Sequence, residues 1–173
     1  MPKKVRLSRD QRASLLDELL TEVRMHQNAQ DAFDDAACAL LGINRSDGRA
    51  LDILDRAGPI SAGELAREAS LSTAAITALL DRMERAGYVR RVRDTVDRRR
   101  VLVEMTDEAR RRAWAIRGPI AEEAPALLAA YSDEDLIVIR DFLRGGREFL
   151  ARHLARIAPD GARGEAGTPA DAG

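Results

Sequence analysis

The order of elements that the pattern predicts between Leu51 and Thr106 constrains this 173-residue chain more than any other feature. Two short helical patterns are separated by only a few residues, so the two helices must cross at a sharp angle. After Gly87 two β-prone runs follow, at positions 88–93 and 100–105, with a polar tip between them. We therefore expect two crossed helices followed by a two-stranded hairpin.

Both helices carry start and stop signals. Ser61 and Glu64 have the spacing of a capping box, which opens the first helix. Ser72 or Thr73 caps the second helix, and Gly87 ends it. The buried side of this second helix is expected to consist of Ile76, Leu79, Leu80 and Met83.

Positive charge is concentrated in the hairpin. The whole chain has a formal net charge of -1, which by itself does not indicate a nucleic-acid partner. Between Arg85 and Arg100, however, seven arginines stand against two acids, a local net charge of +5. Taken in isolation, such a run favours a solvated hairpin with local ion pairs. Directly after two crossed helices, it favours a surface that meets the phosphate backbone of nucleic acid.

Amphipathic helical patterns flank this central region. Ser8 and Gln11 form a capping-box pattern, and an apolar stripe then continues to Gly42, as one bent helix or as two. Ser46 can cap a short helix that ends before Gly58-Pro59.

The C-terminal pattern begins at Thr106, which is placed to cap another helix. Pro119 and Pro125 are expected to kink or break that helix, because each removes an amide donor. Ser132 opens a last apolar helix, and the residues from Pro159 onward lack periodicity, which predicts a disordered tail.

Composition excludes several classes of function. The single cysteine and two histidines cannot form a multi-cysteine metal site, and no glycine-rich phosphate loop or nucleophile elbow is present. We expect no enzyme activity, no metal and no cofactor. No window approaches the length of a membrane span and the N-terminus lacks a signal-peptide core, so a cytoplasmic protein with no membrane partner is expected.

The expected fold class is mainly α with a small β-hairpin wing, that is, a winged helix-turn-helix between dimerisation helices. The flanking apolar stripes have no partner within a domain of this size, so they should pack against each other and against a second subunit. A two-fold homodimer would present two recognition helices to a pseudo-palindromic operator in double-stranded DNA. The expected segments are an N-terminal helical dimerisation segment (8–45), the winged helix-turn-helix (46–106), C-terminal dimerisation helices (107–157) and a disordered tail (158–173).

Candidate DNA-binding residues lie on the second crossed helix and on the hairpin. Small and hydroxyl side chains on the exposed face of the helix allow close approach to phosphates and base edges, although a capped surface helix is an equally good interpretation of that face alone. At the tip, a guanidinium could enter a narrow minor groove while Asp97 holds an arginine in a planar ion pair. The full set of candidates is Ser72, Thr73, Ala74, Thr77, Ala78, Arg82, Arg91, Arg93, Asp97, Arg98 and Arg99.

Several runs together resemble the multiple-antibiotic-resistance regulator (MarR) family. The most specific are the helix end from Glu84 to Val89, the Asp97-Arg98-Arg99 wing and the helix start at Thr106. The resemblance implies a homodimeric transcriptional regulator, usually a repressor, that a small aromatic or anionic ligand often releases from DNA. Thr95-Val96 departs from the family, which often has a proline in the wing, and Ala78 stands where many relatives carry a polar residue.

The resemblance also implies an effector pocket between the dimer helices and the winged domain. Four residues are candidates to bind the effector there: His26, Gln30, Phe33 and Trp114. The alternative is that they have ordinary roles in the core or on the surface. Two other hypotheses stay open. The winged helix could bind an acidic protein instead of DNA, or Cys38 could make the regulator redox-responsive. A reactive thiol needs a lowered pKa, and the sequence has no basic residue next to Cys38 to lower it, so a buried, inert cysteine is favoured.

Overall fold

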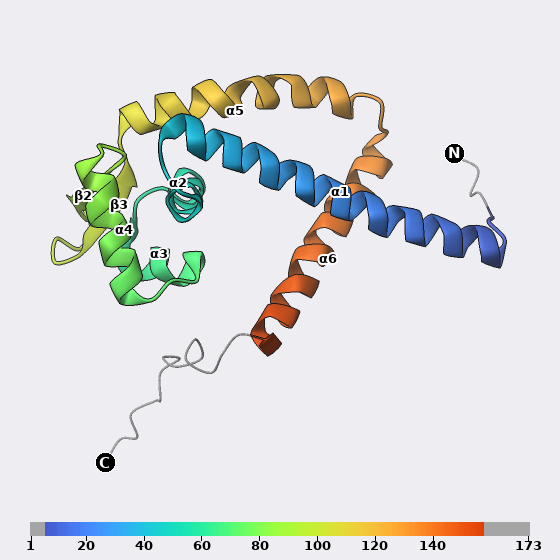
Figure 1. Cartoon of the computed structure of the whole chain (residues 1–173), viewed down its shortest axis with the longest axis horizontal. Coiled ribbons are helices and arrows are strands. Elements are labelled where there is room, and N and C mark those ends of the chain that lie inside the picture. The colour runs from blue at the N-terminus through green and yellow to red at the C-terminus, as the bar shows by residue number, and fades with distance from the viewer. Residues whose placement is uncertain (1–5, 158–173) are drawn as a thin grey trace, which may run out of the picture. The chain divides into compact units, whose positions relative to one another are not determined.

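The computed structural model describes residues 6–157, which form six helices and three short strands (Figure 1). The chain divides into two compact units, residues 1–116 and 117–173. The fold is mainly α with a small antiparallel sheet, as the sequence predicts. The tail predicted at 158–173 lies outside the described residues. No helix in the described part of the chain is both long and apolar enough to cross a membrane.

The first unit begins with α1 (Arg9–Leu41), a single helix that opens with the predicted Ser8–Gln11 capping box. Gly42 ends it in the left-handed region, at φ 70°, where a side chain would be strained. The next helix, α2 (Arg45–Ala57), is capped by Asn44 and not by the predicted Ser46. Asn44 takes the cap position because Asp47 lies three residues later and completes a capping box, which Ser46 cannot do.

The helix-turn-helix follows as α3 (Ala62–Ala69) and α4 (Thr73–Arg85). The predicted Ser61–Glu64 capping box opens α3, and Ser72 caps α4 by accepting a hydrogen bond from the backbone amide of Ala75, at 3.2 Å. The helix-turn-helix shares one core with α2 and the sheet, and the largest fully buried side chains of that core are Leu54, Leu65, Ile76, Leu80, Met83, Val103 and Met105.

The sheet has three strands in the order β1-β3-β2. The predicted hairpin is β2 (Val89–Arg93) and β3 (Val101–Met105), paired antiparallel in the register Val89 with Met105. Sequence patterning misses β1 (Ile60–Ser61), because two residues carry no alternation. This strand joins the start of α3 to the edge of the wing through its pairing with β3.

The helix α5 (Asp107–Leu128) begins after Thr106, whose hydroxyl accepts a hydrogen bond from the backbone amide of Ala109, at 3.1 Å. Pro119 and Pro125, which are expected to kink or break this helix, both lie inside it and do not end it. Both prolines and the residues four positions earlier are exposed, so water can reach the carbonyls that lack an amide donor.

The last helix, α6 (Asp133–Ile157), belongs to the second unit and opens at Ser132, as predicted. Ser132 accepts a hydrogen bond from the backbone amide of Asp135, at 3.2 Å. None of the 25 residues of α6 is buried within the chain. Its apolar side chains therefore have no core of their own.

Candidate nucleic-acid interface

The outer face of α4 carries the short side chains that the sequence singles out. Its core face is buried, whereas Ser72, Thr73, Ala74, Thr77 and Ala78 are all exposed. The Thr77 hydroxyl donates to the carbonyl oxygen of Thr73, at 2.8 Å, so it can still accept a hydrogen bond from a ligand. A helix with this face can approach a groove closely because no long side chain holds it off.

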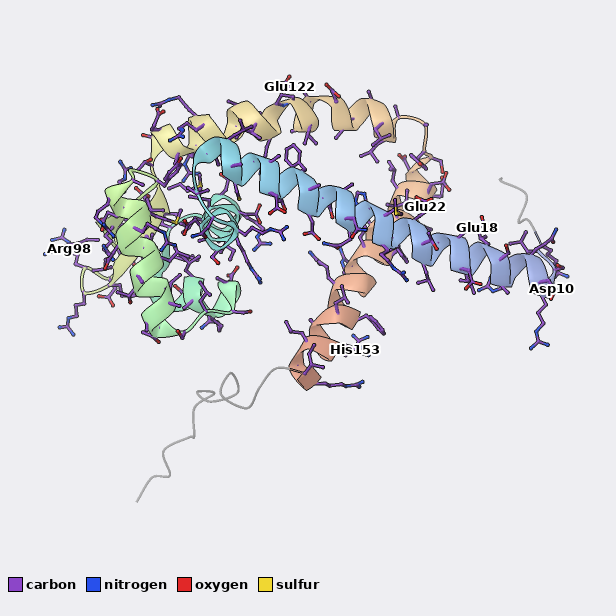
Figure 2. The ribbon with its side chains drawn as sticks, viewed as in Figure 1. Asp10, Glu18, Glu22, Arg98, Glu122 and His153 are labelled. Atoms are coloured by element: carbon purple, nitrogen blue, oxygen red, sulfur yellow. The ribbon has the colours of Figure 1, made fainter. Side chains whose placement is uncertain are left out.

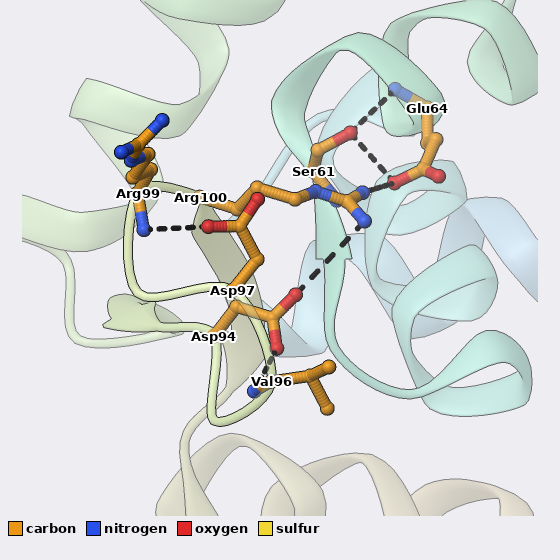
Figure 3. A network of polar contacts seen from close by, with 7 residues as sticks. All are labelled: Ser61, Glu64, Asp94, Val96, Asp97, Arg99 and Arg100. Atoms are coloured by element: carbon orange, nitrogen blue, oxygen red, sulfur yellow. Dashed lines mark hydrogen bonds and ion pairs between the residues drawn. The ribbon is translucent and has the colours of Figure 1, made fainter.

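The wing tip is a tight turn held by its own backbone. The amide of Asp94 donates to the carbonyl oxygen of Arg100, and the amide of Arg100 donates to that of Asp97, at 3.1 and 2.9 Å. Both aspartates also accept backbone hydrogen bonds, Asp94 from Val96 at 2.8 Å and Asp97 from Arg99 at 3.0 Å (Figure 3).

The predicted pairing of Asp97 with an arginine side chain is therefore wrong. The Asp97 carboxylate bonds the backbone amide of Arg99, an Asx-type turn that fixes the chain and leaves the guanidinium out. Within residues 6–157, no carboxylate forms an ion pair with Arg93, Arg98 or Arg99. Figure 2 shows Arg98 extending outward from the wing. The tip thus presents free positive charge.

The base of the wing is anchored to α3 by Arg100. Its guanidinium lies 3.4 Å from the Glu64 carboxylate and 3.9 Å from that of Asp94 (Figure 3). The hydroxyl of Ser61 donates to Glu64 at 2.6 Å, and the Ser61 amide donates to it at 2.8 Å. These hydrogen bonds, with a smaller contribution from Arg100, lower the pKa of Glu64.

The remaining predicted arginines bind partners within the protein. Arg82 forms an ion pair with Asp47, and Arg91 forms ion pairs with Asp81, at 2.6 Å, and with Glu84. Sequence alone groups Arg82 and Arg91 with the wing arginines as DNA ligands. The structure separates them, because their guanidinium groups already satisfy carboxylates on α2 and α4.

The four effector candidates are not joined into a site. His26 and Gln30 are exposed on α1, Phe33 is half-buried there, and Trp114 on α5 is 61% exposed. Among the described residues, no hydrogen bond or ring contact connects any two of these four side chains. Their assignment stays a prediction.

Cys38 is buried at the C-terminal end of α1, as the favoured interpretation expected. A methyl group at Gly48 would lie 2.5 Å from its sulfur atom, so α2 packs directly over the thiol. A thiol covered in this way is a poor target for an oxidant in water.

Removal of the Ser61 hydroxyl should raise the pKa of Glu64. A carboxylate whose pKa is lowered by folding stabilises the protein fully above its unfolded pKa, about 4.3, and that stabilisation is lost as the pH falls through the lower folded value. Ser61→Ala is expected to bring the folded pKa of Glu64 closer to its unfolded value, so the stabilisation is lost over a narrower range of pH. An NMR titration of the Glu64 carboxyl measures this pKa, and Ser72→Ala, which removes a helix cap that has no carboxylate partner, is the control. An unchanged Glu64 pKa in Ser61→Ala would contradict the assigned cause.

The two helices α3 and α4, followed by an arginine-bearing β2–β3 hairpin that β1 extends to a three-stranded sheet, define a winged helix-turn-helix protein. Residues 43–101 match the model of the MarR family. The chain is 37% identical over 125 residues to the HTH-type transcriptional regulator YcgE of Bacillus subtilis, a match that covers 72% of this chain and 81% of YcgE. The chain belongs to the MarR family and is an HTH-type transcriptional regulator.

Solved structures share the fold at lower identity. A MarR family protein from Bacillus stearothermophilus is 23% identical with a TM-score of 0.58, covering 84% of this chain and 99% of that one. A mutant of MepR from a multidrug resistant S. aureus clinical isolate is 19% identical with a TM-score of 0.61, covering 76% and 96% of the two chains. Among these relatives, YcgE is a transcriptional regulator.

Proposed function

We propose that this regulator is a homodimer that represses transcription by binding a pseudo-palindromic site in double-stranded DNA, and that a small ligand releases it. The observation that carries the proposal is that Arg98 and Arg99, at the tip of a wing beside an exposed α4 face, form no ion pair with any carboxylate of residues 6–157. One element suits the major groove and the other suits the minor groove or the backbone. The proposal includes a set of residues that contact DNA: Ser72, Thr73, Ala74, Thr77, Ala78, Arg93, Arg98 and Arg99.

The homodimer is supported by exposed apolar side chains on α1 and on α6. They are at least 40% exposed and recur on α1 and on α6 at helical spacing: Leu15, Leu16, Leu19, Leu20, Val23, Phe142, Leu143, Phe149, Leu150 and Leu154. Burial of apolar surface stabilises an assembly by about 25 cal/mol per Å², so two such faces favour association with a second copy.

Relatives support the repressor and ligand parts of the proposal. The repressor YetL of Bacillus subtilis is 34% identical over 76 residues, which are 44% of this chain. A mutant of MepR from S. aureus has been solved with an oligodeoxyribonucleotide, and NadR has been solved with 4-hydroxyphenylacetate. A small aromatic or anionic compound is therefore the class of effector to screen, with His26, Gln30, Phe33 and Trp114 as first positions to vary.

Fluorescence anisotropy on a duplex from the protein's own upstream region, against a scrambled duplex, tests the proposal. We expect preferential binding to the upstream duplex that weakens steeply with salt as counterions are released. Equal, weak binding to both duplexes would contradict sequence-specific recognition at that site. No binding at low salt would favour the other candidate function, in which the wing binds an acidic protein surface.

A further inference from the structure

Asp47 is the only charged residue buried in the core of the described chain, at 2% exposure. It lies in the first turn of α2, where its carboxylate accepts from the Asn44 amide at 3.4 Å and completes the capping box. The same carboxylate receives both the Nε and the Nη2 of Arg82, which lies 35 residues later on α4. One buried group therefore joins the α1–α2 junction to the helix proposed to enter the major groove.

The geometry of this pair restrains rotation of α4. A planar guanidinium that binds one carboxylate through two nitrogen atoms fixes orientation as well as distance, which a lysine could not do. Arg82 is half-exposed on the flank of α4, between the buried face and the short side chains proposed to meet DNA. A turn of α4 about its own axis would break these hydrogen bonds and leave Asp47 buried without its partner.

Two further residues, Arg45 and Tyr88, fix the same junction. Arg45, the first residue of α2, pairs with Asp31 and Asp35 of α1, each at 2.8 Å. Just beyond α4, the Tyr88 hydroxyl donates to the carbonyl oxygen of Leu41 at the end of α1. Polar contacts thus join α1 to the first turn of α2, and the first turn of α2 to the C-terminal half of α4.

We infer that Asp47 and Arg82 are positioning residues, which hold α4 at the angle that base recognition requires and do not themselves bind DNA. This inference rests on the proposed function and assigns the pair a role in specificity. Contacts to base edges read the sequence and depend on where α4 lies in the groove, whereas contacts to phosphates can be made on any sequence. Loss of the pair should therefore reduce binding to the operator and leave binding to unrelated DNA unchanged.

The test compares Asp47→Asn with wild-type protein on the upstream and scrambled duplexes. Glu68→Gln is the matched control, because it also removes one carboxylate from an ion pair, with Arg56 at 3.3 Å, but that pair joins α2 to α3. We expect Asp47→Asn to lose roughly tenfold in affinity for the upstream duplex, within the usual range of coupling between sites, and to keep its affinity for the scrambled duplex. Glu68→Gln should keep the wild-type ratio of the two affinities.

Tighter DNA binding by Asp47→Asn would contradict the inference. If Arg82 bound phosphate directly, Asp47→Asn would free its charge and tighten binding to both duplexes, which would overturn the inference. Should Asp47→Asn fail to fold by circular dichroism, Arg82→Lys keeps the charge and loses only the two-nitrogen geometry. It is expected to lose preference for the upstream duplex as well, and a full wild-type preference in Arg82→Lys would refute the inference. Wild-type protein without any preference would count against the proposed function itself.

Discussion

Replacing Arg98 and Arg99 together by alanine is expected to weaken operator binding by about 2–6 kcal/mol, since each groove-inserted arginine contributes roughly 1–3 kcal/mol. Neither guanidinium forms an ion pair within residues 6–157, so neither must leave a carboxylate in order to bind DNA. The hydrogen bond that shapes the turn uses the backbone amide of Arg99, which alanine retains. The weaker binding should therefore come from missing DNA contacts and not from collapse of the wing.

Anisotropy titrations at several salt concentrations measure this effect. The control is Arg56→Ala with Arg90→Ala, which removes the same net charge from two arginines already paired, with Glu68 at 3.3 Å and Glu104 at 2.6 Å. In the wing variant, the slope of log affinity against log salt concentration should also be smaller in magnitude by about one for each phosphate that the wing no longer neutralises. A wing variant that binds as tightly as the control would show that the tip does not contact the operator.

The contrast between these arginine sets marks where sequence reasoning stops. The excess of arginine between Arg85 and Arg100 correctly indicates a basic hairpin, but residue counts treat every arginine alike. Whether an arginine is free depends on carboxylates that folding brings near. Asp47 reaches Arg82 across 35 residues, and Glu64 reaches Arg100 across 36. No local pattern encodes such pairs.

Local sequence signals predict an element well when the residues that determine it are close together in the chain, and they fail when a distant segment determines it. A capping box spans four residues, so the boxes at Ser8 and Ser61 can be recognised directly. The strand β1 has two residues and exists because β3 lies beside it, so its sequence carries no signal. The helix-breaking rule overestimates the effect of Pro119 and Pro125, because both prolines and the residues four positions earlier are exposed, so water can hydrate the carbonyls that lose an amide donor.

A charge placed on the apolar face of α6 is expected to abolish the homodimer. Leu143 and Leu150 are 56% and 64% exposed in the isolated chain and lie seven residues apart, on one face of the helix. Leu143→Glu with Leu150→Glu would bury carboxylates in the proposed interface, and each unpaired buried charge costs several kcal/mol. Since no residue of α6 is buried within the chain, the fold of the winged domain should remain intact.

Sedimentation equilibrium distinguishes the outcomes, because the chain mass is 19.0 kDa and a homodimer has twice that mass. We expect dimeric wild-type protein, a monomeric double variant, and operator binding weaker by on the order of a hundredfold, since a monomer cannot engage two half-sites together. Arg152→Ala with Arg156→Ala, which changes the net charge of α6 by the same amount without placing a carboxylate at Leu143 or Leu150, should stay dimeric. A double variant that remains dimeric would remove α6 from the interface and leave α1 as the face to vary next, whereas monomeric wild-type protein would contradict the homodimer itself.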